Sequence, residues 1–176
     1  MTTLPEKIVE LHVALDRAEL AHAFGGALAL AWCTERARGT IDIDLNVFVG
    51  VKELERVLAA LPDPIDPTDE QHSLLERDGQ ARLWWDTTPV DLFLNTTDFH
   101  AAAARRCRWE EFLGTSIPFL SCDDLAVFKA FFDRTKDWAD LEEMRAADSL
   151  DVDRVVGVLV RHLGPDDHRV ERILQL

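Results

Sequence analysis

One alternating segment in the first third of the chain constrains the fold more than any other. Every second position of residues 41–49 is apolar: Ile41, Ile43, Leu45, Val47 and Val49. Because successive side chains of a strand point to opposite faces, these residues share one face, and Asp42 and Asp44 share the other. The segment therefore predicts a half-buried strand that presents two carboxylates side by side.

Adjacent carboxylates raise each other's proton affinity unless a cation neutralises them. A third acid, Asp91, belongs to a second alternating segment, in which Val90, Leu92 and Leu94 face the other way. Hard oxygen ligands of this kind are typical of Mg²⁺ or Mn²⁺ sites. We therefore expect Asp42, Asp44 and Asp91 to bind a divalent metal. The alternative is a solvated polar strand face.

A glycine turn, Phe24-Gly25-Gly26, precedes the acidic strand, and the gap between them has room for one helix. The ordered set of this turn, Asp42-x-Asp44 and Asp91 resembles the signature of the nucleotidyltransferase superfamily. A later segment is similar to the tail motif of its stand-alone bacterial branch, which includes the AbiEii-type toxins. It contains Lys129, Arg134-Thr135-Lys136-Asp137 and Asp140. The resemblance covers about residues 23–141.

The resemblance implies an enzyme that transfers a nucleoside monophosphate from an NTP to a hydroxyl group and releases pyrophosphate. Asp42, Asp44 and Asp91 would be its catalytic residues and metal ligands, with Mg²⁺ or Mn²⁺ as cofactor. The implied nucleotide-binding residues are Gly25, Gly26, Arg38, Thr40, Lys129, Lys136 and Asp140.

Either lysine of the tail motif can supply the contact to the β- or γ-phosphate. We prefer Lys129, because its position among Phe128, Phe131 and Phe132 would otherwise bury an unpaired charge. Lys129, Asp133, Lys136 and Asp140 would share one face of a continuous helix. The alternative for these four residues is a solvated face with ion pairs.

Two acceptors fit the resemblance. One is the 3′ end of a tRNA, as in the toxin-like members, with an antitoxin protein as partner; the other is a small hydroxyl compound, as in antibiotic-modifying relatives. The formal charge of −14 opposes an extended nucleic-acid interface, whereas the tail motif favours the toxin-like branch. A local basic patch can come only from Arg36, Arg38, Arg105, Arg106 and Arg108. A different interpretation is a catalytically inactive fold that serves as a binding protein.

Cys33, Cys107 and Cys122 are odd in number and widely spaced, which argues against a disulfide framework. We therefore expect a reduced, cytoplasmic protein. The N-terminal segment is charged, unlike a signal peptide, and the apolar stretches are too short to span a membrane.

At 176 residues and 47% hydrophobic, the chain is expected to form a single compact domain. We predict an α+β nucleotidyltransferase-like fold, in which residues 1–120 form a mixed sheet covered by helices and residues 121–176 form a helical segment packed on it. The predicted helices are 5–20, 27–36, 52–61, 99–107 and 121–176, the last broken near Ser149 and Gly164. The predicted strands are 21–24, 41–49, 73–77, 80–85, 90–94 and 117–120, with Asp78-Gly79 as a hairpin turn. Of the adjacent Trp84 and Trp85, one is expected in the core.

Overall fold

The computed structural model describes residues 2–176. The chain divides into two compact units. The first holds the chain up to Leu28 together with Gly39–Leu120, and the second holds Ala29–Arg38 together with Ser121–Leu176. The expected division after residue 120 differs from this one at Ala29–Arg38, which group with the C-terminal helices.

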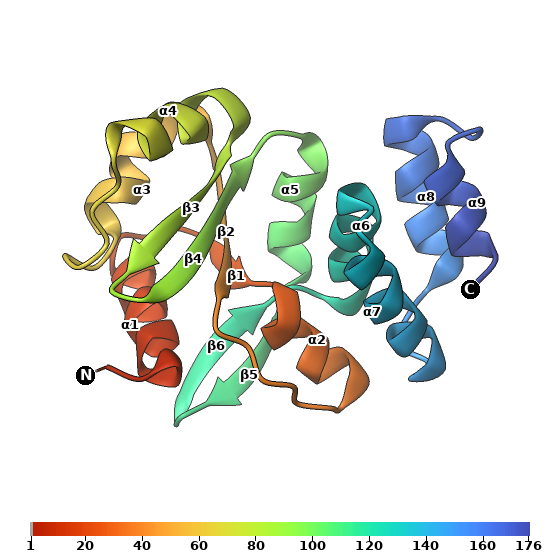
Figure 1. Ribbon diagram of the computed structural model, residues 1–176, viewed down its shortest axis with the longest axis horizontal. Coiled ribbons are helices and arrows are strands. Elements are labelled where there is room, and N and C mark those ends of the chain that lie inside the picture. Colours follow the sequence, from red (N-terminus) through yellow and green to blue (C-terminus); the bar gives the residue numbers. More distant parts are fainter. Residues whose placement is uncertain (1) are drawn as a thin grey trace. The chain divides into compact units, whose positions relative to one another are not determined.

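The first unit is built on a mixed sheet whose six strands, in the described chain, have the order β3-β4-β2-β1-β6-β5 (Figure 1). The strands are β1 (His22–Phe24), β2 (Ile43–Gly50), β3 (Gln80–Trp85), β4 (Thr88–Asn95), β5 (Arg108–Phe112) and β6 (Thr115–Phe119). β2 runs parallel to β4 and antiparallel to β1, whereas β1 runs parallel to β6. The outer strands β3 and β5 are antiparallel to β4 and β6. The predicted α+β class with a mixed sheet is confirmed.

The described part of the first unit also contains four helices, three of which contact the sheet. The four are α1 (Leu4–Arg17), α3 (Leu54–Ala60), α4 (Asp69–Asp78) and α5 (Asp98–Ala103), with short 3₁₀ turns at Val51–Glu53 and Ala104–Arg106. α5 contacts β2 and β4, α1 contacts β6, and α4 contacts β3, while α3 contacts α1. α2 (Gly26–Thr34) begins in the first unit and ends in the second.

The acidic strand follows its predicted pattern except at its start. Ile43, Leu45 and Val47 are fully buried, because their shared face covers the core. Ile41 is 79% exposed and precedes β2, so it does not belong to the apolar face. The strand begins two residues later than expected.

The predicted strand and hairpin before β3 are wrong. Asp69–Asp78 form the helix α4, which Thr68 and Gln71 cap reciprocally at its N-terminus. Gly79, expected in a hairpin turn, is the left-handed residue that ends this helix, with φ 68°. The hairpin lies one strand later, where Trp85 pairs with Thr88 across a tight turn. The strand β5 was also missed.

The second unit contains α6 (Cys122–Phe132), α7 (Thr135–Ala146), α8 (Val152–Leu163) and α9 (His168–Leu174). α6 contacts α7, α8 and α9. Asp133 ends α6 in a left-handed conformation, with φ 55°. Lys129 and Asp140 therefore lie on two different helices, and the predicted continuous helix face does not exist.

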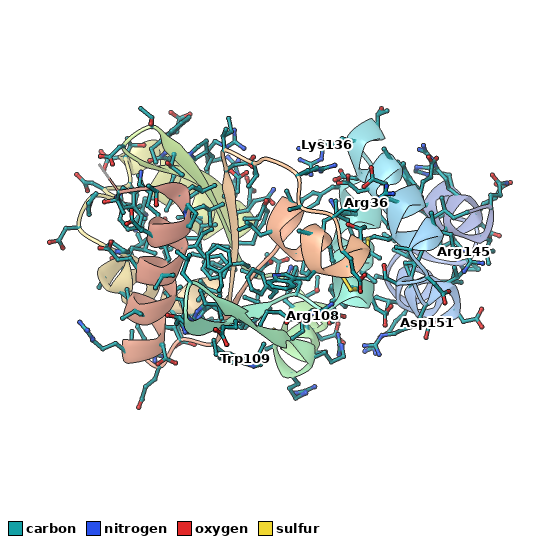
Figure 2. The ribbon with its side chains drawn as sticks, turned by 90° about the horizontal axis from the view of Figure 1, so that it is seen from below. Arg36, Arg108, Trp109, Lys136, Arg145 and Asp151 are labelled. Carbon is teal, nitrogen blue, oxygen red and sulfur yellow. A yellow bond between two sulfur atoms is a disulfide. The ribbon has the colours of Figure 1, made fainter. Side chains whose placement is uncertain are left out.

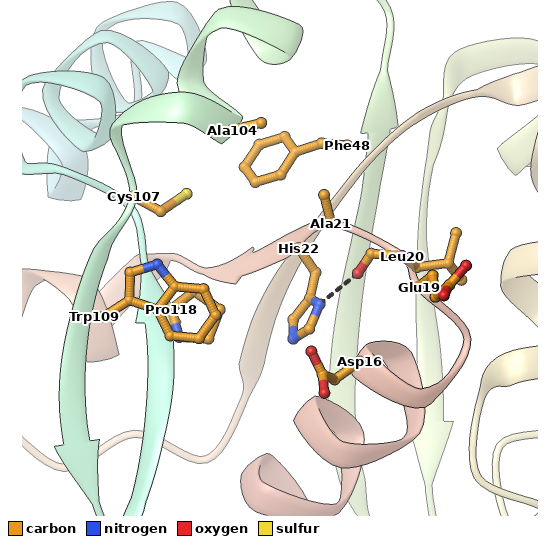
Figure 3. Close-up of a pocket in the computed structure, with 10 residues that line it drawn as sticks. All are labelled: Asp16, Glu19, Leu20, Ala21, His22, Phe48, Ala104, Cys107, Trp109 and Pro118. Atoms are coloured by element: carbon orange, nitrogen blue, oxygen red, sulfur yellow. Dashed lines mark hydrogen bonds between the residues drawn. The ribbon is translucent and has the colours of Figure 1, made fainter.

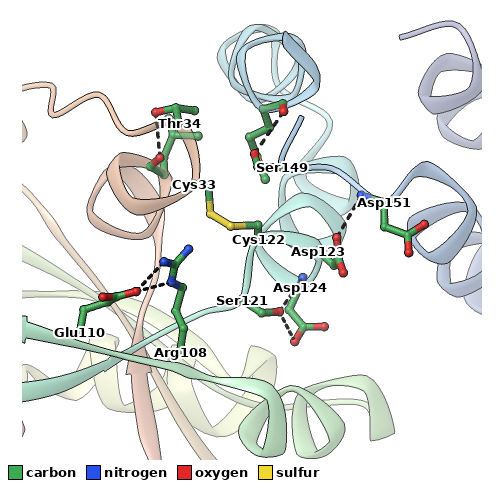
Figure 4. The surroundings of a disulfide bond; sticks show 12 residues. Cys33, Thr34, Arg108, Glu110, Ser121, Cys122, Asp123, Asp124, Ser149 and Asp151 are labelled. Carbon is green, nitrogen blue, oxygen red and sulfur yellow. Dashed lines mark hydrogen bonds and ion pairs between the residues drawn. A yellow bond between two sulfur atoms is a disulfide. The ribbon is translucent and has the colours of Figure 1, made fainter. Parts of the chain in front are cut away.

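The expectation of unpaired cysteines is also wrong. Cys33 at the end of α2 forms a disulfide with Cys122 at the start of α6 (Figure 4). The two residues are 89 positions apart in the sequence, so no local cysteine spacing indicates that they pair. Cys107 is free. The cysteine pattern thus no longer supports a reducing compartment. Among the described residues, no helix is both long and apolar enough to cross a membrane.

Candidate active site

Three carboxylates lie on or directly beside the neighbouring interior strands β2 and β4 of the first unit. Asp44 on β2 is the direct register partner of Asp91 on β4. Asp42 immediately precedes β2 and lies two residues before Asp44 in the chain. The structure therefore places the three predicted acids on or beside two paired parallel strands.

The glycine turn after β1 lies directly beside Asp44. The N–H of Gly25 donates to the carbonyl oxygen of Asp44 at 2.9 Å. Gly26 has φ +53°, and a Cβ atom there would lie 2.5 Å from Cγ of Asp44 and closer still to Oδ2. Glycine at position 26 thus satisfies a left-handed backbone and leaves space for the carboxylate. α2 begins here, so its first-turn N–H groups are presented next to the acids.

Thr40 holds Asp42 in place. Its hydroxyl donates to Oδ1 of Asp42 at 2.6 Å, and the N–H of Asp42 donates back to Thr40 Oγ1 at 3.4 Å. This small ring of hydrogen bonds orients the carboxylate before the strand begins. Thr40, predicted to bind the nucleotide, therefore contacts a predicted metal ligand.

An arginine that the sequence analysis missed lies among the acids. Arg82 on β3 is the register partner of Asp91, and its Nε and Nη2 donate to the two oxygens of Asp91, both at 2.7 Å. The same Nη2 lies 3.6 Å from Oδ2 of Asp42. Hydrogen bonding to Asp91 raises the pKa of Arg82 further, so the guanidinium remains charged. Counting back from the turn after Trp85 was the signal that could have placed Arg82 opposite Asp91.

The donor chemistry of this cluster fits a hard divalent cation. Its three acids offer carboxylate oxygens, and Asp42 and Asp91 already converge on one positive group, the Arg82 guanidinium. In this conformation both oxygens of Asp91 are directed to Arg82. Within residues 2–176, no group of three or more His, Cys, Asp or Glu side chains is arranged to enclose a metal ion. The residues suit magnesium in kind, while the positive charge at the site comes from Arg82.

The residues of the tail motif form an ion-pair network in the second unit. Lys129 is 6% exposed, and its Nζ lies 2.6 Å from Oδ2 of Asp140 and 3.8 Å from Oδ1 of Asp137. Arg38 donates to both oxygens of the same Asp140, at 2.6 and 3.1 Å. Burial raises the pKa of Asp140, but hydrogen bonds from Arg38 and Lys129 outweigh it and lower the pKa overall. The charge of Lys129 is therefore paired, contrary to our premise.

Lys136, the other candidate phosphate ligand, is exposed on α7 (Figure 2). Of the five arginines considered for a basic patch, Arg38 pairs with Asp140 and Arg108 pairs with Glu110 through Nε at 2.7 Å. Arg36 and Arg105 are exposed. At least two of these positive charges are thus offset by nearby carboxylates.

The adjacent tryptophans of β3 have different environments. Trp85 is 2% exposed, which confirms that one of the pair belongs to the core. Trp84 is 50% exposed and lies on the face of β3 that carries Arg82. Its register partner is Pro89, two residues before Asp91. An aromatic surface therefore adjoins the acids on the same face of the sheet.

A cavity of about 190 Å³ lies at the other end of β1 (Figure 3). It is lined by residues that include His22, Phe48, Cys107 and Trp109. Nδ1 of His22 lies 2.7 Å from the Leu20 carbonyl oxygen, and Nε2 lies 2.9 Å from Nδ1 of His12. A carbonyl only accepts, so His22 carries its proton on Nδ1 and accepts from His12. Burial lowers the pKa of both imidazoles.

No protein-family model matches the chain, and no curated protein matches it. Solved structures do match the chain. The antibiotic-resistance factor ANT(2'')-Ia is 17% identical over 98% of this chain and 89% of its own, with a TM-score of 0.54. An antigenic nucleotidyltransferase-like protein from Paracoccidioides brasiliensis is 14% identical over 94% of this chain and 92% of its own, with a TM-score of 0.50. These similarities establish a nucleotidyltransferase-like fold.

Proposed function

We propose that this chain is a nucleotidyltransferase, which moves a nucleoside monophosphate from an NTP to a hydroxyl acceptor and releases pyrophosphate. The observation that carries the proposal is the placement of Asp42, Asp44 and Asp91 on or beside the paired strands β2 and β4, with Asp44 against the Gly26 turn. The nucleotidyltransferase-like fold supports it. The presence of all three acids favours an active enzyme over an inactive binding protein.

Asp42, Asp44 and Asp91 would hold Mg²⁺ or Mn²⁺, which when bound neutralises the triphosphate and lowers the pKa of the attacking hydroxyl. The N–H groups at the start of α2 receive phosphate oxygens. The acceptor oxygen forms a bond to the α-phosphorus while the bond from that phosphorus to the pyrophosphate oxygen breaks. Asp91 accepts the hydroxyl proton. Thr40 keeps Asp42 oriented throughout.

The test is metal-dependent stabilisation by substrate. Millimolar Mg²⁺ or Mn²⁺ with an NTP should raise the Tm of the wild-type protein, because only the folded state binds them. Asp44→Asn should abolish this shift and leave the apo protein at least as stable, since one of three neighbouring negative charges is gone. Asp63→Asn, an exposed loop change, is the matched control. An Asp44→Asn variant that responds like the wild type would contradict the site.

Two acceptors are supported by different observations. The charge of −14 favours a small hydroxyl compound, and the fold shared with an antibiotic-resistance factor agrees with this. The tail residues Lys136, Asp137 and Asp140 resemble the AbiEii-type branch, which favours a tRNA 3′ end and an antitoxin partner. Phosphate contacts in the RNA case must come from the few exposed arginines.

One labelling experiment distinguishes between the two acceptors. Four labelled NTPs are incubated with Mg²⁺ and either total RNA or a panel of small hydroxyl compounds. Transfer to RNA should fall steeply with added salt, because each neutralised phosphate releases counterions. Exchange of Arg105 and Arg106 for Glu should then reduce RNA labelling and spare NTP binding. Label on a small compound, with little salt dependence, would assign the other acceptor.

A further inference from the structure

Arg82 supplies the positive charge that Asp91 and Asp42 share in the described structure. Its planar fork matches the carboxylate of Asp91 at two distances of 2.7 Å, a geometry that lysine cannot reproduce. Oδ2 of Asp42 is 3.6 Å from the same nitrogen, while Oδ1 of Asp42 is bound by Thr40. Oδ2 of Asp42 and both oxygens of Asp91 are thus directed to one cation, the Arg82 guanidinium.

Arg82 does not neutralise all the negative charge of the three acids. Three carboxylates and one guanidinium together carry two net negative charges, so Arg82 reduces the repulsion among Asp42, Asp44 and Asp91 without removing it. A divalent ion supplies twice the charge of Arg82 and takes several oxygen ligands at once. Arg82 and such an ion would draw on the same oxygens of Asp91.

The position of Arg82 allows its side chain to move away from Asp91. β3 is an edge strand, and the Arg82 side chain is 50% exposed, against 20% for Asp91 and 31% for Asp42. Exposed ion pairs are weak and rearrange at little cost. Arginine is not deprotonated in proteins, so its release from Asp91 requires movement of the side chain.

We propose that Arg82 is an internal competitor of the divalent cation, which holds Asp91 and Asp42 in the metal-free protein and must swing away from Asp91 when the ion binds. Arg82 is a positioning residue: it prevents the acids from repelling one another in the free protein and raises the metal concentration needed to organise the site. This inference rests on the proposed function, because it assumes that the three acids bind a metal.

Direct Mn²⁺ binding to the full chain, measured by calorimetry or by the electron paramagnetic resonance of free Mn²⁺, tests the proposal without any turnover. Arg82→Met should bind Mn²⁺ about tenfold more tightly, because one pairing partner and one repelling charge are removed. Arg82→Lys should fall between, since a point charge replaces the fork. The apo Arg82→Met protein should melt at lower temperature and gain more from Mn²⁺ than the wild type.

The matched control is Arg77→Met. Arg77 makes the same kind of exposed, two-pronged pair with a neighbouring acid, Asp78, but does not face the three acids. It should leave Mn²⁺ binding unchanged.

The contradicting outcome is that Arg82→Met binds Mn²⁺ no more tightly than the wild type, while the wild type still binds Mn²⁺ in a way that depends on Asp44. That result would overturn the competition by Arg82 and leave the proposed function standing. A lack of Mn²⁺ binding by both proteins at millimolar concentration would overturn the metal site itself, and the competition with it. Arg82→Lys serves the same comparison if the Met variant folds poorly.

Discussion

The carboxylate of Asp44 fills the space that a side chain at Gly26 would need. Cγ of Asp44 would lie 2.5 Å from a Cβ atom at that position, and Gly26 has φ +53°. The glycine turn and the acidic strand are therefore fitted to each other, although 17 residues lie between Gly26 and Asp44 in the sequence.

Gly26→Ala should disturb this fit in two ways. Alanine in the left-handed region costs about 1 to 2 kcal/mol, and its methyl group must displace the Asp44 carboxylate. We expect a lower Tm and loss of the stabilisation by Mg²⁺ and NTP. Gly39→Ala is the control, since a Cβ atom there meets nothing within 4 Å. A normal ligand response in Gly26→Ala would show that the contact has no role in binding.

The two lysines of the tail motif should differ in what they contribute. Lys129→Ala removes the partner of buried Asp140, and breaking a buried pair costs about 3 to 5 kcal/mol; Arg38 compensates for part of this loss. Exposed Lys136→Ala should leave stability nearly unchanged but weaken NTP binding by about 1.5 to 3 kcal/mol. Thermal melts and NTP titrations of both variants measure this, with exposed Lys52→Ala as control.

If Lys129→Ala keeps its stability and loses NTP binding, while Lys136→Ala binds normally, our first preference for Lys129 was right. The paired geometry would then be a resting state that the nucleotide displaces.

The disulfide should contribute substantially to the stability of the oxidised protein. In the chain-entropy model, closing a loop of this length stabilises the folded state by about 4 to 5 kcal/mol, given a separation of 89 residues. Cys33→Ser, or treatment with a reductant, should lower the Tm, whereas Cys107→Ser should not. Mass spectrometry of peptides from the unreduced protein identifies the linked pair. Equal melting with and without reductant would contradict a stabilising bond.

Buried His12 and His22 predict a loss of stability in mild acid. Burial lowers the pKa of both imidazoles, so the unfolded chain binds protons that the folded chain does not. The two histidines therefore do not reduce the free energy of unfolding above the unfolded-state pKa of about 6.5. Below that pH the free energy of unfolding falls, by up to about 1.4 kcal/mol per pH unit for each histidine. Denaturant unfolding between pH 8 and pH 5 measures the slope.

The double change His12→Asn and His22→Asn removes both titrating groups and should flatten this dependence, whatever its effect on absolute stability. An unchanged slope would assign the acid sensitivity to other residues.

Short-range patterns predicted much of the fold and placed Asp44 and Asp91 on strands. Alternation identified β2, β4 and the positions of Asp44 and Asp91 in them, because side-chain direction in a strand depends only on position along it. Local signals were ambiguous where one residue suits two structures. Gly79 favours a left-handed backbone in a hairpin and at a helix end alike, and the Thr68 cap decides for the helix.

Local patterns along the chain show which residues alternate, which segments can be strands or helices, and that Asp44 and Asp91 lie opposite the apolar faces of their strands. The pairing of distant groups became visible only in the folded chain: Arg82 with Asp91, Lys129 with Asp140, and Cys33 with Cys122. The reason is physical. Periodicity is a property of neighbours along one element, whereas a charge or thiol finds its partner only after strand order, register and helix breaks have been set by packing of the whole chain.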